Sequence, residues 1–118
     1  MNQGSDFDPA TLAKIEKKLG PRVLGEIIDL FCEHGPKRMR TIREGRQSGD
    51  LSTSADALHS IKGSAAMIGS VRLAELAHRM ELMAGAGDVA GVTELVGDLE
   101  TAFADSIAYY RERRKNLK

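Results

Sequence analysis

Apolar residues recur at intervals of three and four along almost the whole chain, which is the spacing of one face of an α-helix. Val, Ile and Thr do not alternate with polar residues over any stretch long enough to indicate a β-strand. The longest apolar stripe runs through Val92, Leu95, Val96, Leu99, Phe103, Ile107 and Tyr110. The pattern therefore predicts an all-α protein.

Turn and capping residues divide the first part of this pattern. Asp8 with Pro9 behind it is a helix start, and Gly20-Pro21 is a helix end. The short helix between them is expected to bury Leu12, Ile15 and Leu19. A second helix is predicted from about residue 22 to residue 47, kinked at Gly35-Pro36, because its apolar positions resume in phase after the proline. A true break at Gly35 is the alternative.

Three further helices follow, separated by short turns. Ser52 or Thr53 is expected to cap the first of them, Ser70 the second and Asp88 the third. Gly69 ends the helix that precedes Ser70. The residues expected in the core of the first two are Leu58, Ile61, Ala65, Met67, Ile68, Leu73, Leu76, Ala77, Met80 and Met83.

Short connections between amphipathic helices place consecutive helices antiparallel to one another. The predicted fold is an antiparallel up-and-down four-helix bundle with a short additional N-terminal helix. It forms a single domain over residues 8–115, after a flexible lead-in of residues 1–7.

Composition excludes several classes of function. Seventeen basic residues balance seventeen acidic ones, and only 4% of residues are aromatic, so a nucleic-acid binder is not expected. The sequence shows no long apolar run and no secretory signal, so no membrane association is expected. Cys32 is the only cysteine and is interpreted as a packing residue. A cytoplasmic monomer is the resulting expectation.

The candidate chemistry lies on the helix that contains Leu58. His59 stands one position off the buried stripe, so its ring is expected to reach solvent. Lys62, Gly63 and Ala66 follow on the same strip of the helix, and Ala55 and Asp56 precede His59 on it. A histidine is thus surrounded by small side chains, with one cation a turn away.

This arrangement suits transfer of a phosphoryl group. A neutral imidazole is a nitrogen nucleophile near pH 7, because its unperturbed pKa is about 6.5. Lys62 is placed to pair with the phosphoryl oxygens. A glycine in a helix interior costs about 1 kcal/mol relative to alanine, so Gly63 requires a reason. The preferred explanation for this glycine is that a partner approaches closely beside His59, and the second is that two helices pack closely there.

The run from Leu58 to Leu73 closely resembles sequences of the histidine-phosphotransfer (HPt) family of multistep phosphorelays. The family's signature is His-x-x-Lys-Gly with a second glycine six positions later. His59, Lys62, Gly63 and Gly69 match it residue by residue. The resemblance covers the chain from about Asp8 to Tyr110.

The resemblance implies that His59 accepts and donates a phosphoryl group, that Lys62 supports it and that Gly63 keeps the docking surface open. Ala55, Asp56 and Ala66 would share in docking. The implied partners are receiver domains of response regulators and hybrid histidine kinases. They would bring their own Mg²⁺, so no cofactor is expected in this chain. No nucleotide-binding loop or kinase signature occurs, which indicates a phosphocarrier without ATP-dependent kinase activity of its own.

The sequence is also compatible with two other functions. A non-catalytic bundle adaptor could dock on a kinase or response regulator without carrying phosphate. A hydrolase could use His59 as a general base with Asp56 three positions before it. His34 and His78 are interpreted as polar surface residues, and the histidines are not spaced as metal ligands. The basic residues near the C-terminus are interpreted as a solvated helix end.

Overall fold

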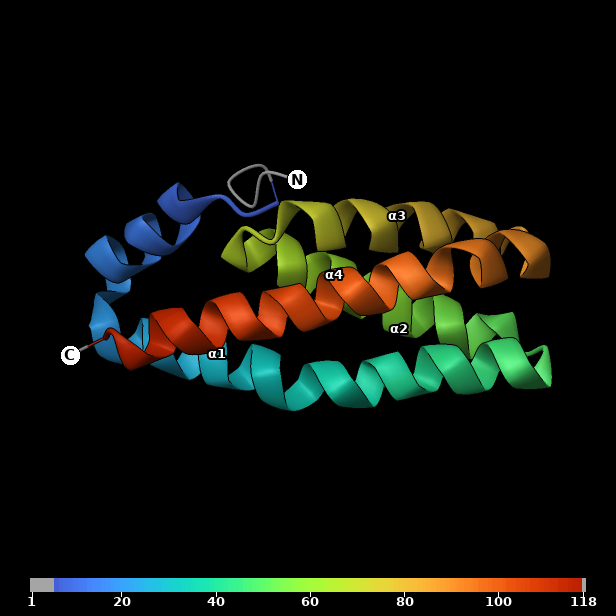
Figure 1. Cartoon of the computed structure of the whole chain (residues 1–118), viewed down its shortest axis with the longest axis horizontal. Coiled ribbons are helices and arrows are strands. Elements are labelled where there is room, and N and C mark those ends of the chain that lie inside the picture. The colour runs from blue at the N-terminus through green and yellow to red at the C-terminus, as the bar shows by residue number, and fades with distance from the viewer. Residues whose placement is uncertain (1–5, 118) are drawn as a thin grey trace.

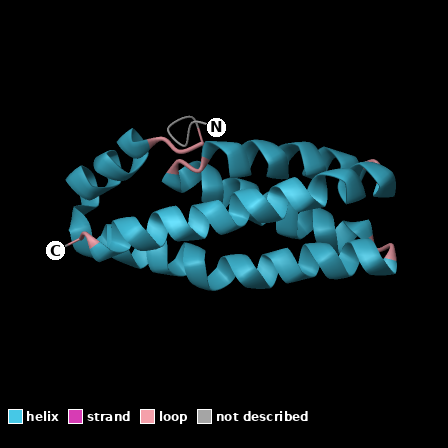
Figure 2. Ribbon diagram, viewed as in Figure 1, coloured by secondary structure: helices cyan, strands magenta, loops and turns pink. Residues whose placement is uncertain are grey.

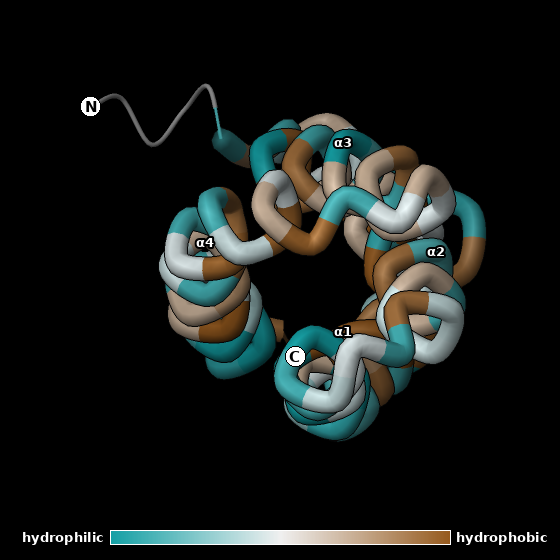
Figure 3. Tube along the Cα trace, turned by 90° about the vertical axis from the view of Figure 1, so that its right-hand side faces the viewer, coloured by the Kyte–Doolittle hydropathy of each residue, from teal (hydrophilic) through white to brown (hydrophobic). Residues whose placement is uncertain are grey.

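The computed structural model describes residues 6–117 as four helices with short connections. Their bounds are α1 Pro9–Ser48, α2 Leu51–Ile68, α3 Val71–Gly85 and α4 Val89–Lys115. Figures 1 and 2 show them side by side along the long axis of the molecule. Consecutive helices contact each other, and α1 also contacts α4, which closes the ring seen end-on in Figure 3. The predicted four-helix bundle is confirmed.

α1 contains two helical segments joined at Gly20. Gly20 is the one residue of α1 with non-helical dihedrals, φ 88° and ψ 164°. The short helix before it is the predicted additional helix, and it turns away from the rest of α1 (Figure 1). Helical dihedrals continue through Gly35 and Pro36. One continuous second helix is therefore confirmed, and the alternative of a break at Gly35 is wrong.

The N-terminal end of the described chain differs from the expected flexible lead-in. Residues 1–5 lie outside the described residues, but Phe7 is buried and stacks on Tyr109 with ring centroids 4.1 Å apart. The backbone of this segment also pairs with the α2–α3 connection, because Asp8 N donates to Gly69 O at 2.8 Å and Val71 N donates to Asp6 O at 2.9 Å. An aromatic stack and backbone hydrogen bonds hold Asp6 and Phe7 against the bundle.

Two of the expected helix caps differ in the structure. Asp50, not Ser52 or Thr53, is the N-cap of α2, and its carboxylate accepts hydrogen bonds from the backbone and side chain of Ser52. Ser70 occupies the N-cap position of α3 but makes no capping hydrogen bond. Its hydroxyl is buried and lies 2.6 Å from that of Ser106 on α4. Asp88 caps α4 as predicted.

The core consists of the inward faces of all four helices. Its fully buried large side chains are Leu12, Leu24, Ile28, Ile42, Leu58, Ile68, Leu73, Met80, Val92, Leu99 and Tyr110. Two residues expected in the core are instead exposed, namely Leu19 and Met67. Leu19 is the last residue before the Gly20 bend, where the short helix points away from the bundle. Met67 lies on the outer edge of α2, at a groove with α1.

The C-terminal basic cluster is partly a helix contact. Arg114 donates two hydrogen bonds to the Asp29 carboxylate of α1, at 3.1 and 3.2 Å. Its guanidinium lies over Gly25, where a Cβ atom would come within 2.7 Å of it. Arg114 therefore joins α4 to α1 and is not only a solvated charge. Among the described residues, no helix combines the length and apolar character that a membrane crossing requires.

Candidate functional site

The structure places a carboxylate from α3 between the two chemically distinctive residues of α2. His59 Nδ1 lies 2.9 Å from one carboxylate oxygen of Glu81, and Lys62 Nζ lies 2.7 Å from the other. His59 and Lys62 reach the same carboxylate because residues three positions apart share one strip of a helix. The site is therefore a His59–Glu81–Lys62 cluster that spans two helices.

The three side chains differ in their access to solvent. The side chain of His59 is 69% exposed, whereas those of Lys62 and Glu81 are 29% and 24% exposed. The ring edge that contains Nδ1 faces Glu81, so Nε2 lies on the opposite edge of the ring. The cluster thus leaves the histidine accessible to solvent and keeps the ion pair beside it partly shielded from water.

The charge of Glu81 is set by its two neighbours. A hydrogen bond from Lys62 is the largest influence and lowers the pKa of the Glu81 carboxyl below its ordinary value of 4.5. Desolvation opposes this shift, and the hydrogen bond from His59 lowers the pKa further. Glu81 is therefore an anion at neutral pH, and its carboxylate can accept a hydrogen bond from a proton on Nδ1 of His59.

Sequence reasoning missed Glu81, although the sequence held a signal for it. His59 precedes the turn residue Gly69 by ten positions, and Glu81 follows Ser70 by eleven. In an antiparallel helical hairpin, residues at nearly equal distances from the turn lie side by side. The positions of the two residues along the hairpin were thus predictable. The rotation of α3 about its axis, which turns Glu81 toward α2, was not.

The surface beside His59 is open. A Cβ atom at Gly63 would meet no other atom within 4 Å, so helix packing does not require this glycine. Asp56 and Ala66 are exposed on the same strip, whereas Ala55 is half-buried and packs against the core. A flat surface of small residues therefore surrounds the exposed ring.

Gly69 serves the fold, because it ends a helix and lies against the N-terminal segment of the chain. It ends α2 in the left-handed conformation, with φ 85°. A Cβ atom here would lie 2.7 Å from the carbonyl oxygen of Asp8, and 2.9 Å from the side chain of Thr11. Only glycine suits both the backbone conformation and this close approach.

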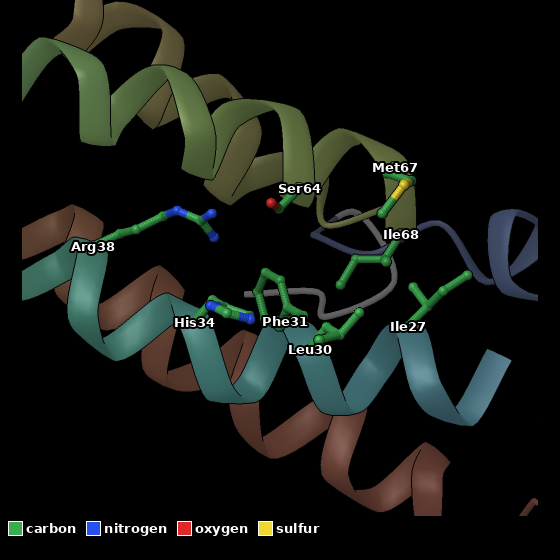
Figure 4. A pocket seen from close by; sticks show the side chains of 8 residues that line it. All are labelled: Ile27, Leu30, Phe31, His34, Arg38, Ser64, Met67 and Ile68. Carbon is green, nitrogen blue, oxygen red and sulfur yellow. The ribbon is translucent and has the colours of Figure 1, made fainter. Parts of the chain in front are cut away.

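A groove between α1 and α2 borders the open surface. It has a volume of about 250 Å³, and Figure 4 shows its lining of Ile27, Leu30, Phe31, His34, Arg38, Ser64, Met67 and Ile68. One end is apolar, and at the other the Arg38 side chain extends from α1 toward Ser64 of α2. Met67 follows Gly63 by one helical turn, so the groove and the strip of His59 are adjacent on α2.

The other two histidines lie elsewhere. His34 lines the groove on α1, and His78 is exposed on α3. Neither has a side-chain hydrogen bond to another described residue. Residues 6–117 contain no group of three side chains placed to hold a metal ion.

The sequence model of the Hpt domain matches residues 26–109, which include His59, Lys62, Gly63 and Glu81. The chain belongs to the Hpt domain family. This family consists of histidine-containing phosphotransfer domains that act in phosphorelay signalling. The match spans most of the second segment of α1, all of α2 and α3, and most of α4.

The fold of this Hpt domain is similar to a solved structure. The crystal structure of histidine-containing phosphotransfer protein B (HptB) from Pseudomonas aeruginosa PAO1 superposes with a TM-score of 0.90 at 23% sequence identity. The superposition covers 96% of this chain and 97% of the other, and at this identity it shows a shared fold. No curated protein matches the chain at the level of sequence.

Proposed function

We propose that His59 of this Hpt domain carries the phosphoryl group, receiving it from the aspartyl phosphate of one receiver domain and passing it to the aspartate of another. The observation that supports this assignment is the His59–Glu81–Lys62 cluster, in which an exposed ring stands beside a partly buried cation. Among the described residues, neither His34 nor His78 makes a side-chain hydrogen bond or an ion pair, whereas His59 makes both with Glu81.

The chemistry needs one nitrogen lone pair and no redox step. The ring nitrogen of His59 attacks phosphorus, a P–N bond forms, and the P–O bond to the aspartate breaks. The leaving carboxylate takes the electron pair of the broken bond. Delivery to the second receiver reverses these changes. Lys62 stabilises the transferring charge by pairing with phosphoryl oxygens.

The receiver would dock on the face formed by His59, Gly63, Ala66 and the groove between α1 and α2. Gly63 and Ala66 let the partner's backbone approach the ring, since neither side chain rises above the helix surface. Leu30 and Met67, at the edge of the groove, are 52% and 56% exposed. Large exposed apolar side chains beside an open strip are typical of a protein interaction surface.

In this proposal the domain contributes no metal site and no nucleotide site. The receiver would supply Mg²⁺ together with its own carboxylates. The purified domain would therefore stay unlabelled in ATP and magnesium. It would be labelled only when a charged receiver is added.

Labelling with radioactive phosphate tests the assignment. A receiver domain charged with ³²P-acetyl phosphate is mixed with the chain and with its His59→Gln, His34→Gln and His78→Gln variants. We expect acid-labile label on the wild type and on the last two variants, and none on His59→Gln. Label that persists on His59→Gln would refute the assignment, and a receiver complex without any label would favour the adaptor function.

A further inference from the structure

The side chain of Arg38 extends into the groove between α1 and α2 and has no partner there. Figure 4 shows its guanidinium at the polar end of the groove, pointing from α1 toward α2. Arg22, Arg43 and Arg114 each have a carboxylate partner. Arg38 makes no side-chain hydrogen bond or ion pair with another described residue. A guanidinium is always charged and carries five N–H donors, so a half-buried cation with free donors faces the groove.

None of the residues that line the groove carries a negative charge. The polar residues of the lining are Arg38, His34 and Ser64, and the other five are apolar. An occupant that satisfies Arg38 must therefore bring its own acceptor. A carboxylate suits this role best, because its two oxygens accept from two parallel N–H groups of one guanidinium. The Ser64 hydroxyl can donate to the same carboxylate.

The apolar end of the groove lies about two helical turns from Arg38. Leu30 precedes Arg38 by eight residues on α1, which corresponds to about 12 Å along the helix axis. Leu30 and Met67 are both more than half exposed, so an apolar group that covers them removes apolar surface from water. The occupant should thus present an apolar group and a carboxylate about 12 Å apart. A helix does so with two residues seven or eight positions apart on one face.

We propose that Arg38 selects the receiver, by pairing with an aspartate or glutamate on a receiver helix that also places an apolar side chain against Leu30 and Met67. The inference rests on the proposed function, and it adds the chemistry of the partner's docking helix and the residue that recognises it. Ser64 follows Gly63 directly, and Met67 follows it by one turn. A helix seated in the groove is therefore adjacent to the open strip of His59.

The selection works by penalty as well as by attraction. A receiver that lacked the carboxylate would cover the Arg38 guanidinium with apolar surface. A charge buried without a partner is strongly unfavourable. Arg38 thus disfavours unsuitable receivers, which is how a single charged residue gives an interface its specificity.

The test uses the full chain with Arg38→Gln and Arg38→Glu. Glutamine removes the charge, and glutamate reverses it. Arg40→Gln and Arg40→Glu are the matched controls, because Arg40 is an exposed cation of the same helix that does not line the groove. The controls carry the same changes of net charge, so they report the effect of long-range attraction alone. Thermal melts of all variants verify that the fold persists.

The first measurement is calorimetric titration with a receiver domain that binds the wild type. We expect a Kd about 10-fold higher for Arg38→Gln, the lower end of the effect of a hydrogen bond to a charged group, because Arg38 is only half-buried. Arg38→Glu should bind more weakly still. Both Arg40 variants should stay within about threefold of the wild type, as is typical of a solvent-exposed charge. Equal effects at Arg38 and Arg40 would overturn the proposal.

A charge swap identifies the partner of Arg38. Each aspartate and glutamate on the helices of that receiver is changed to lysine and titrated against Arg38→Glu. We expect one of these changes to restore binding, at a position seven or eight residues from an apolar side chain. Absence of any rescue would contradict the pairing.

Sedimentation equilibrium of the free chain tests a second occupant of the groove. We expect the wild type to be a monomer. A dimer that Arg38→Glu dissociates would show that a second copy of the chain fills the groove, and would overturn the proposal.

Phosphotransfer kinetics separate docking from chemistry. In Arg38→Gln the receiver concentration that gives half the maximal rate should rise about 10-fold, while the maximal rate stays unchanged. A lower maximal rate at an unchanged half-saturating concentration would place Arg38 at the phosphoryl group and refute the docking role. A receiver that binds the wild type without ever labelling it would instead refute the proposed function, and the titrations would still decide the role of Arg38.

Discussion

The phenol of Tyr110 on α4 donates a 2.9 Å hydrogen bond to the backbone carbonyl oxygen of Ile68, at the C-terminal end of α2. The last carbonyl groups of a helix have no partner within the helix. Tyr110 supplies a hydrogen-bond donor for this carbonyl group from another helix, and the tyrosine side chain is buried. Burial raises the pKa of the Tyr110 hydroxyl, so the phenol remains a hydrogen-bond donor throughout the neutral range. This bond joins the helix of His59 to the last helix of the bundle.

Tyr110→Phe should lower the free energy of unfolding by about 1–3 kcal/mol, because it leaves a buried carbonyl group without a donor. Tyr109→Phe is the control, since Tyr109 is half-buried and contributes its ring stack on Phe7 without a side-chain hydrogen bond to a described residue. Urea denaturation followed by circular dichroism measures both. Equal stability of the two variants would show that the hydrogen bond contributes little.

Gly45 and Gly63 should respond oppositely to alanine. A Cβ atom at Gly45 would collide with the side chain of Ser54 and lie 2.8 Å from the carbonyl oxygen of Asp50. Overpacking of this kind typically costs about 1–3 kcal/mol. At Gly63 the Cβ atom would meet open space, so Gly63→Ala should stabilise the helix by up to about 1 kcal/mol. Thermal melts of the two variants give the comparison, and a destabilised Gly63→Ala would contradict the structure.

Gly63→Gln should weaken binding of the receiver and slow phosphotransfer, with little change in melting temperature. The larger side chain would lie on the strip where the partner approaches His59, and nothing in the bundle opposes it. Calorimetric titration with the receiver and a melt on the same sample separate the two effects. If Gly63→Gln unfolds the protein while binding per folded molecule is normal, the docking face lies elsewhere.

Leu30→Asp should also weaken receiver binding, since it places a charge in the apolar end of the groove. Leu82→Asp is the matched control, because Leu82 is an exposed leucine of similar accessibility on α3, 63% against 52%, and does not line the groove. Titration of both variants with the same receiver should show a higher Kd for Leu30→Asp alone. An equal effect at the two sites would argue against the groove as the docking surface.

The contribution of Glu81 to stability should depend on pH. Its carboxyl has a lowered pKa in the folded protein, chiefly because of the hydrogen bond from Lys62. A lowered pKa stabilises the folded state well above the ordinary value of 4.5, and this stabilisation is lost as the pH falls through the folded pKa. The difference in unfolding free energy between wild type and Glu81→Gln should therefore be largest near neutral pH and shrink in acid. A difference that grows in acid would contradict the assigned shift.

Much of this protein was predictable because the relevant interactions are local in sequence. Helical periodicity, the Asp8 and Asp88 caps and the glycine at the end of α2 depend on neighbouring residues, so the four helices and their order could be predicted. The grouping of His59, Lys62 and Gly63 was predictable for the same reason, since residues three and four apart on one helix always share a face.

The rotation of each helix about its own axis was decided by tertiary packing, because it depends on side chains from other helices. That rotation turns Glu81 toward His59 and Met67 toward the groove with α1. It also gives two helical glycines opposite surroundings, Gly45 against Ser54 and Gly63 in open space. The sequence by itself determined which residue could carry phosphate, and the tertiary structure decided which carboxylate lies beside that residue and which surface around it stays open.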